Sequence, residues 1–161
     1  MAQSPIWQIE QVALDSTGAM VAGSLADKVS DLLGAVNIYV GVYPTLAVGA
    51  TVSTGTGAWV EGAYFPVVPI GTITNPFHIH GVCVETCTLA GGVFCLSLYA
   101  GVGHVEVARV RWPVVGGFFG NIVDLTTGVR IAANSQIDAK LASDVGGPDT
   151  ITMSIRYAEE A

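Results

Sequence analysis

The chain has 161 residues, of which 51% are hydrophobic and only 12% are charged, and its formal net charge is −7. Its six Lys and Arg residues are scattered, so it lacks the clustered positive charge that nucleic acids and anionic membrane surfaces require. A single domain of this length cannot bury so much apolar surface within itself, and we expect the excess to be buried between subunits.

The first 36 residues differ in pattern from the rest and are predicted to form an N-terminal arm with a short helix. Residues 24–34 begin with a capping serine, carry an apolar stripe at helical spacing and end at a glycine. Such a helix either packs against its own domain or belongs to an arm that reaches a neighbouring subunit. Residues 1–5 do not have the pattern of a signal peptide, so we expect the chain to stay in a cytoplasm-like compartment unless it leaves as part of a particle.

Two uncharged stretches, residues 37–60 and 86–103, have the length of a transmembrane helix. Both are interrupted by Gly, Pro or Thr, whereas a spanning helix needs about 20 mainly apolar residues. We therefore interpret both stretches as β-structure and expect no membrane partner.

From residue 37 onward the sequence predicts strands separated by turns rich in Gly and Pro. The expected strands are residues 37–43, 46–53, 67–73, 77–89, 93–100, 104–112, 122–125, 129–132, 135–143 and 149–157. Apolar residues alternate with polar ones in the last two, as in strands with one face on a core. Short strands at this spacing predict that residues 37–161 form an all-β domain, an antiparallel β-sandwich of jelly-roll type.

Residues 77–89 and 93–100 are predicted to pair as a hairpin, which would place Cys87 opposite Cys95. Neither face of residues 93–100 is strongly polar, so we expect this strand to be covered on both sides. A disulfide between the two cysteines is geometrically possible. A reducing compartment and an odd number of cysteines favour buried thiols that act as small hydrophobic side chains.

The histidines and cysteines suggest a metal site at first sight. Zinc needs about four converging ligands. On a regular strand, however, His78 and His80 share one face, while Cys83 and Cys87 lie on the other. These cysteines would be about 13 Å apart at ~3.3 Å per residue, and they could bind one ion only if a bulge at Gly81 redirected the strand. Packing is the favoured interpretation, and we predict no metal and no cofactor.

The sequence also gives little support for a catalytic site. No motif that would activate a nucleophilic Ser or Cys surrounds the histidines. The carboxylates of Glu61, Glu85 and Glu106 could form a pair for glycoside hydrolysis. We instead expect Glu85 and Glu106 to pair with an arginine such as Arg109 or Arg111. The chain is therefore predicted not to be an enzyme.

The larger aromatic side chains outside the predicted hairpin favour a subunit interface. The candidate interface residues are Trp59, Tyr64, Phe65, Phe118 and Phe119, together with Arg109 and Arg111. Aromatic residues are enriched in interface cores, and few charges lie near these ones. A sugar-binding site is the alternative, because such sites stack aromatic rings on the ligand.

Residues 131–143 and 146–157, preceded by residues 77–100, resemble the end of small β-sandwich virion proteins of tailed bacteriophages, and the likeness in strand pattern covers residues 37–157. The resemblance implies a non-enzymatic capsid decoration or cement protein, commonly a trimer, that binds across the seams between shell subunits. Its expected partners are further copies of itself and the major capsid protein or another virion protein, and its expected location is the virion. The alternative is a carbohydrate- or receptor-binding sandwich of a tail fibre or baseplate.

Overall fold

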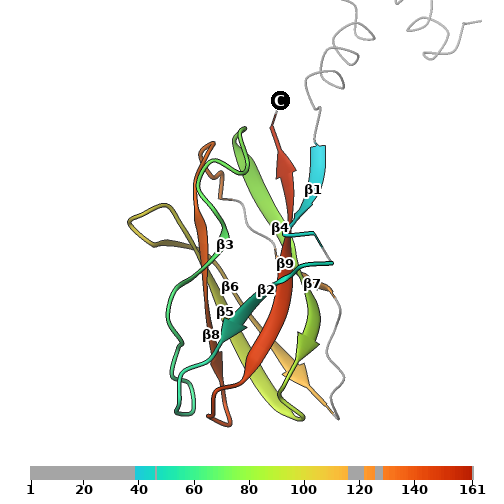
Figure 1. Ribbon diagram of the computed structural model, residues 1–161, viewed down its shortest axis with the longest axis vertical. Coiled ribbons are helices and arrows are strands. Elements are labelled where there is room, and N and C mark those ends of the chain that lie inside the picture. Colours follow the sequence, from blue (N-terminus) through green and yellow to red (C-terminus); the bar gives the residue numbers. More distant parts are fainter. Residues whose placement is uncertain (1–38, 46, 116–121, 126–128, 161) are drawn as a thin grey trace, which may run out of the picture. The chain divides into compact units, whose positions relative to one another are not determined.

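Nine β-strands in two antiparallel sheets make up the regular structure of the described residues (Figure 1). The computed structural model describes residues 39–45, 47–115, 122–125 and 129–160, which all belong to one structural unit. The strands are β1 (Tyr39–Tyr43), β2 (Ala50–Ser53), β3 (Phe65–Val68), β4 (Phe77–Cys87), β5 (Gly92–Ala100), β6 (Val105–Val114), β7 (Ile122–Asp124), β8 (Ile137–Ser143) and β9 (Thr150–Glu159). Within these ranges there is no helix, and hence none that could span a membrane.

The strand pairings are those of a jelly roll. Strands β1 and β2 both pair with β9, β3 pairs with β8, β4 with β7, and β5 with β6, as in one long antiparallel hairpin that has been rolled up. Further pairings of β9 with β4 and of β8 with β5 complete the two sheets. The prediction of an all-β antiparallel sandwich is confirmed, while the predicted arm and helix of residues 1–36 lie outside the described residues.

The core lies between the two sheets and is built from alternate residues of their strands. On β5 and β8 the buried, inward-facing residues are Phe94, Leu96, Leu98, Ile137, Ala139 and Leu141, and on β9 they are Ile151, Met153, Ile155 and Tyr157. The alternation predicted for the last two strands is therefore confirmed. It places every second side chain of those strands in the apolar layer, where burial stabilises the fold.

The predicted hairpin of residues 77–89 and 93–100 is wrong. Strand β4 pairs with β9 and β7, whereas β5 pairs with β8 and β6, so the intervening turn carries the chain from one sheet to the other. Cys87 lies opposite Ile151, and Cys95 lies opposite Arg111, so the two cysteines do not face each other. All three cysteines are free thiols. A glycine turn between two apolar strands does not specify to which sheet the second strand belongs.

Three other predicted strands are shortened or absent. The predicted strand of residues 46–53 is reduced to β2, because residues 47 and 48 form a turn. Strand β3 ends at Val68, because Pro69 has no N–H to continue the ladder. Residues 69–73 form a turn, in which Gly71 takes a φ of 79°. Residues 129–132 make an isolated bridge between Ile131 and Phe77 rather than a strand.

Candidate functional site

Most of the candidate interface residues that the structure describes lie at one face of the β3–β8–β5–β6 sheet. We call the side of this sheet that points away from the core the outer face. Three rows of residues cross it from β8 through β5 to β6: Ala142–Cys95–Arg111, Lys140–Ser97–Arg109 and Asp138–Tyr99–Glu106. Glu106 joins this face because a bulge leaves Val107 without an opposite residue on β5, which shifts the alternation by one position.

The segment of residues 54–64, which precedes β3, runs along the open edge of β8. The Trp59 N–H donates to the Ser143 carbonyl at 2.6 Å, and the Gly62 N–H donates to the Leu141 carbonyl at 2.9 Å. These bonds extend the pairing of β3 with β8 and place the side chains of this segment over the outer face. Side chains of β5 that point outward are therefore buried, including Ser97. The prediction that this strand is covered on both sides is confirmed.

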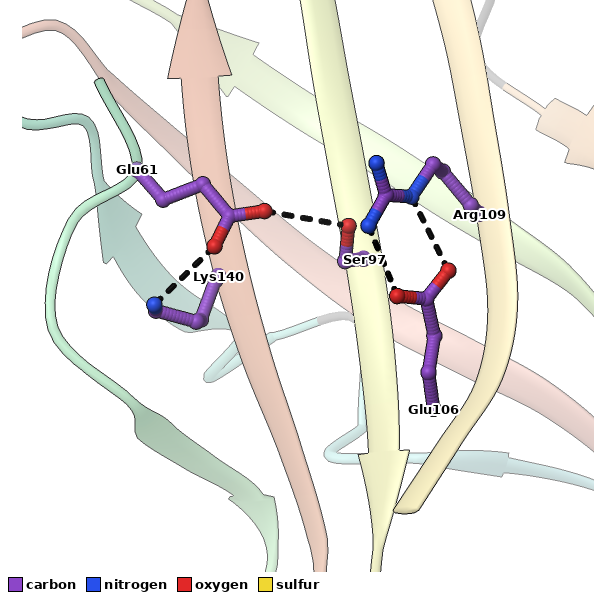
Figure 2. Close-up of polar contacts among 5 residues, drawn as sticks. All are labelled: Glu61, Ser97, Glu106, Arg109 and Lys140. Carbon is purple, nitrogen blue, oxygen red and sulfur yellow. Dashed lines mark hydrogen bonds and ion pairs between the residues drawn. The ribbon is translucent and has the colours of Figure 1, made fainter. Parts of the chain in front are cut away.

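Two ion pairs lie beside each other on this face (Figure 2). Glu61 reaches from the covering segment to Lys140 on β8, with 2.9 Å between Oε2 and Nζ, and it accepts a 3.5 Å hydrogen bond from the Ser97 hydroxyl. On β6, Arg109 donates from Nε and Nη2 to the two carboxylate oxygens of Glu106, at 2.9 and 2.7 Å. The hydrogen bond that Lys140 donates to Glu61 raises the pKa of Lys140, and the hydrogen bonds that Arg109 donates to Glu106 raise the pKa of Arg109.

Replacing Glu61 by glutamine is expected to destabilise the protein by about 1 kcal/mol at neutral pH, because the pair is partly exposed and glutamine keeps an oxygen for Ser97. The raised pKa of Lys140 means that this stabilisation is complete below the ordinary lysine pKa of 10.5 and is lost as the pH rises through the folded-state value. Urea unfolding of both proteins should therefore give free energies that converge in strong alkali. Equal stabilities at neutral pH would contradict the assigned role of the pair.

Tyr64 is held in place by three neighbours although it is exposed. Its ring stacks on His104 with centroids 3.8 Å apart, meets the edge of Tyr99 at 5.1 Å and lies 4.7 Å from Lys140 Nζ. Stacking, edge-to-face and cation–π contacts of this kind each stabilise a ring in one orientation. The ring is therefore presented to solvent in a preformed position.

A buried carboxylate lies beneath this aromatic group. The Asp138 side chain is 2% exposed, and its Oδ2 lies 3.1 Å from Nδ1 of His104. These two atoms are in close contact but are not aligned as a hydrogen bond, and neither has another partner among the described residues. The other oxygen of Asp138 accepts a 2.7 Å hydrogen bond from Gln136. An isolated buried charge is costly, so the Asp138 carboxylate is more stable when it keeps its contact with His104. This contact links β8, which carries Asp138, to the turn before β6, which carries His104.

Trp59 and Arg111 are both exposed at the outer face. Trp59 is 45% exposed and has a φ of 59°, which is rare for a bulky residue. Backbone hydrogen bonds from Val60 to Gly57 and from Gly55 to Val60 hold this loop. The Cζ atom of Arg111 lies 4.8 Å from the centroid of the indole, within cation–π range. The loop thus presents a strained aromatic residue beside a guanidinium.

The structure brings together four of the candidate interface residues, namely Trp59, Tyr64, Arg109 and Arg111. Phe65 is exposed at the start of β3, and Phe118 and Phe119 lie outside the described residues. The expected pairing of Glu106 with an arginine is found. That of Glu85 is not, since Glu85 accepts a hydrogen bond from Ser154 instead.

The sequence did not indicate the residues that support the aromatic ones: Lys140 and His104 contact Tyr64, and Asp138 contacts His104. The outward alternation of residues 136, 138 and 140 was a signal for one side of these contacts. It carried no information on which distant segment covers them.

The histidines and cysteines do not come together in the described part of the chain. His78 pairs with Glu160 at 2.8 Å, and burial raises the pKa of the Cys83 and Cys87 thiols. Across the described ranges, no group of three or more His, Cys, Asp and Glu side chains is placed to hold a metal ion.

The chain matches no protein-family model, and no curated protein sequence is similar to it. The jelly-roll fold and the outer face are therefore the features that bear on the function of the chain.

Proposed function

We propose that the chain is a non-enzymatic structural subunit of a phage particle, a decoration or cement protein of the head. In this proposal it assembles as a homo-oligomer, with a trimer favoured, and binds across the seams between shell subunits. The observation that carries the proposal is the amount of large apolar side chain exposed on a sheet sandwich that has few charges.

Many large apolar side chains are exposed in the described part of the chain. They are Val42, Val48, Trp59, Val60, Tyr64, Phe65, Ile70, Val102, Val105, Val115, Val129 and Val145. Single exposed apolar residues are normal, but this set belongs to a chain with only 12% charged residues. Permanent interfaces are the most apolar class of protein contact, which supports burial of part of this set between subunits.

The fold is compatible with this role, since jelly rolls are common in viral capsid and lectin domains. Compatibility of a fold narrows the range of functions but does not select one. A subunit that binds the assembled shell better than free shell proteins stabilises the shell by mass action. Attachment at several points multiplies weak contacts, and a net negative charge keeps particles apart.

The first test is the mass of the protein in solution. Sedimentation velocity at micromolar concentration is expected to give three times the mass of the single chain, because the exposed apolar residues are buried only in the oligomer. A stable monomer would contradict the homo-oligomer. The assignment to the virion is tested separately, since the protein should co-purify with particles from infected cells, and its absence from them would contradict that part.

A carbohydrate-binding sandwich of a tail fibre or baseplate is the second candidate. It is favoured by the exposure of Tyr64 and of Trp59, whose ring lies beside Arg111, since such rings can stack on a sugar and the guanidinium can pair with an acidic group. A glycan array separates the candidates, because binding that is lost in Trp59→Ala would favour the second.

A further inference from the structure

Arg111 differs from the other cations of the described residues. Arg109 pairs with Glu106, Arg130 with Glu160, Lys140 with Glu61 and Arg156 with Asp124, at 2.6–3.9 Å. Arg111 has no acidic partner among the residues that the structure describes, and its contact there is with the ring of Trp59. A guanidinium in this setting keeps its capacity for a bidentate bond to a carboxylate.

The carboxylates of the described residues are already in contact with donors. Glu61, Glu106, Asp124 and Glu160 form ion pairs, Asp138 and Glu159 accept from side-chain amides, Glu85 and Asp149 accept from serines, and Asp144 accepts from the Val93 N–H. The remaining acidic residues of the sequence are Glu10, Asp15, Asp27 and Asp31, which all precede β1. In residues 1–36 their only cationic side chain is Lys28.

We propose that residues 1–36 of a second copy dock on the outer face at Trp59 and Arg111. A carboxylate of this segment pairs with the Arg111 guanidinium, and its apolar side chains cover Trp59, Val60 and Tyr64. Tryptophan, tyrosine and arginine are the residue types that dominate binding energy at interfaces. The inference rests on the homo-oligomer of the proposed function and names the surface and the segment that would form it.

Residues 1–36 and the outer face are complementary in charge and in apolar character. Residues 1–36 combine four carboxylates with apolar runs such as residues 5–7 and 12–14. The outer face offers one unpaired cation next to exposed rings. Complementary charge fixes the register of an interface, and burial of the rings supplies its affinity.

The homo-oligomer of the proposed function is the reason for placing the segment on a second copy. Residue Tyr39 starts β1 opposite Glu159, at the end of β9, whereas the Trp59 loop is bonded to Ser143, beside the turn that leads into β9 (Figure 1). The described chain thus starts at the opposite end of β9 from the docking surface and in the other sheet. In a head-to-tail ring, the segment of each copy would dock on the next copy, which is a heterologous interface.

The test uses full-length variants. Arg111→Glu is expected to weaken self-association at least about tenfold in sedimentation equilibrium, because the buried carboxylate of the partner then meets a like charge. Arg130→Glu is the matched control, since it reverses another exposed arginine that already has its own partner, Glu160, and it should leave association unchanged. Circular dichroism and thermal unfolding establish that both variants fold.

A charge swap identifies the occupant. Changing Glu10, Asp15, Asp27 and Asp31 to lysine should weaken association as Arg111→Glu does, and combining all five changes should restore most of it. Weakening without restoration would show that the outer face is an interface for something other than this segment and would overturn the proposal.

Three further outcomes would also contradict the docking of residues 1–36 on a second copy. An oligomer of wild-type protein that Arg111→Glu leaves intact overturns the docking site while the homo-oligomer stands. A wild-type monomer overturns both. If Arg111→Glu increases quenching of Trp59 fluorescence by acrylamide, in a Trp7→Phe background, without changing the mass, the segment docks on its own copy.

Discussion

Replacing Phe94 by alanine is expected to lower the free energy of unfolding by about 3–5 kcal/mol. Phe94 is 0% exposed on the central strand β5, and its ring centroid lies 5.6 Å from that of Trp112. The loss combines the transfer free energy of the ring with the cavity that it leaves, since both sheets limit collapse at this position.

Urea unfolding at a fixed protein concentration measures this loss, because association also contributes to apparent stability. Val102→Ala is the control, since Val102 is 84% exposed, and the change should stay within about 0.5 kcal/mol. A loss below about 1 kcal/mol for Phe94→Ala would contradict the packing of the core.

Replacing Gly62 by alanine is expected to cost about 1–3 kcal/mol and to disturb the outer face. A Cβ at this position would overlap the carbonyl oxygen of Ser53 and lie 3.0 Å from its carbonyl carbon. Backbone cannot yield as a flexible side chain does, so the covering segment must move away from Ser53, and this movement disturbs its contacts with β8. The Gly62–Leu141 hydrogen bond and the Glu61–Lys140 ion pair are then weakened together.

Two readings separate this effect from general destabilisation. In a Trp7→Phe background and under native conditions, acrylamide should quench tryptophan fluorescence more readily with Gly62→Ala than without it, since Trp112 is buried and Trp59 supplies the accessible signal. Gly103→Ala is the matched control, because a Cβ there meets no atom within 4 Å. Identical stability and quenching for the two variants would mean that the segment is not held as described.

The fold could be predicted from the sequence because the alternation of β8 and β9 is a local property. Ile151, Met153 and Ile155 share a face whatever the partner strands are. The pairing of β4 and β5 could not be predicted in the same way. Both strands are apolar enough to belong to either sheet, and the glycines of the turn between them permit a tight hairpin as well as a passage between sheets.

The residues of the candidate site also divide into those that the sequence could predict and those that it could not. Exposed aromatic residues such as Trp59 and Tyr64 could be selected by composition and by their place in loops. Their supports could not, because Glu61 meets Ser97 across 36 residues of sequence, and Lys140 is farther still. Such contacts depend on which strand β3 pairs with, and this pairing forms only when the two sheets assemble.

The positions of β8 and β9 in the sheets have a consequence for synthesis. In each sheet a strand from residues 137–159 lies between strands formed much earlier in the chain (Figure 1). Strands β1 and β2 have no partner until β9 leaves the ribosome, and β3 waits for β8, whereas β4 and β5 can pair earlier with β7 and β6. Strand β1 is therefore followed by more than a hundred residues before its partner β9 is made, and during this time the unpaired strands are exposed to aggregation and to chaperones.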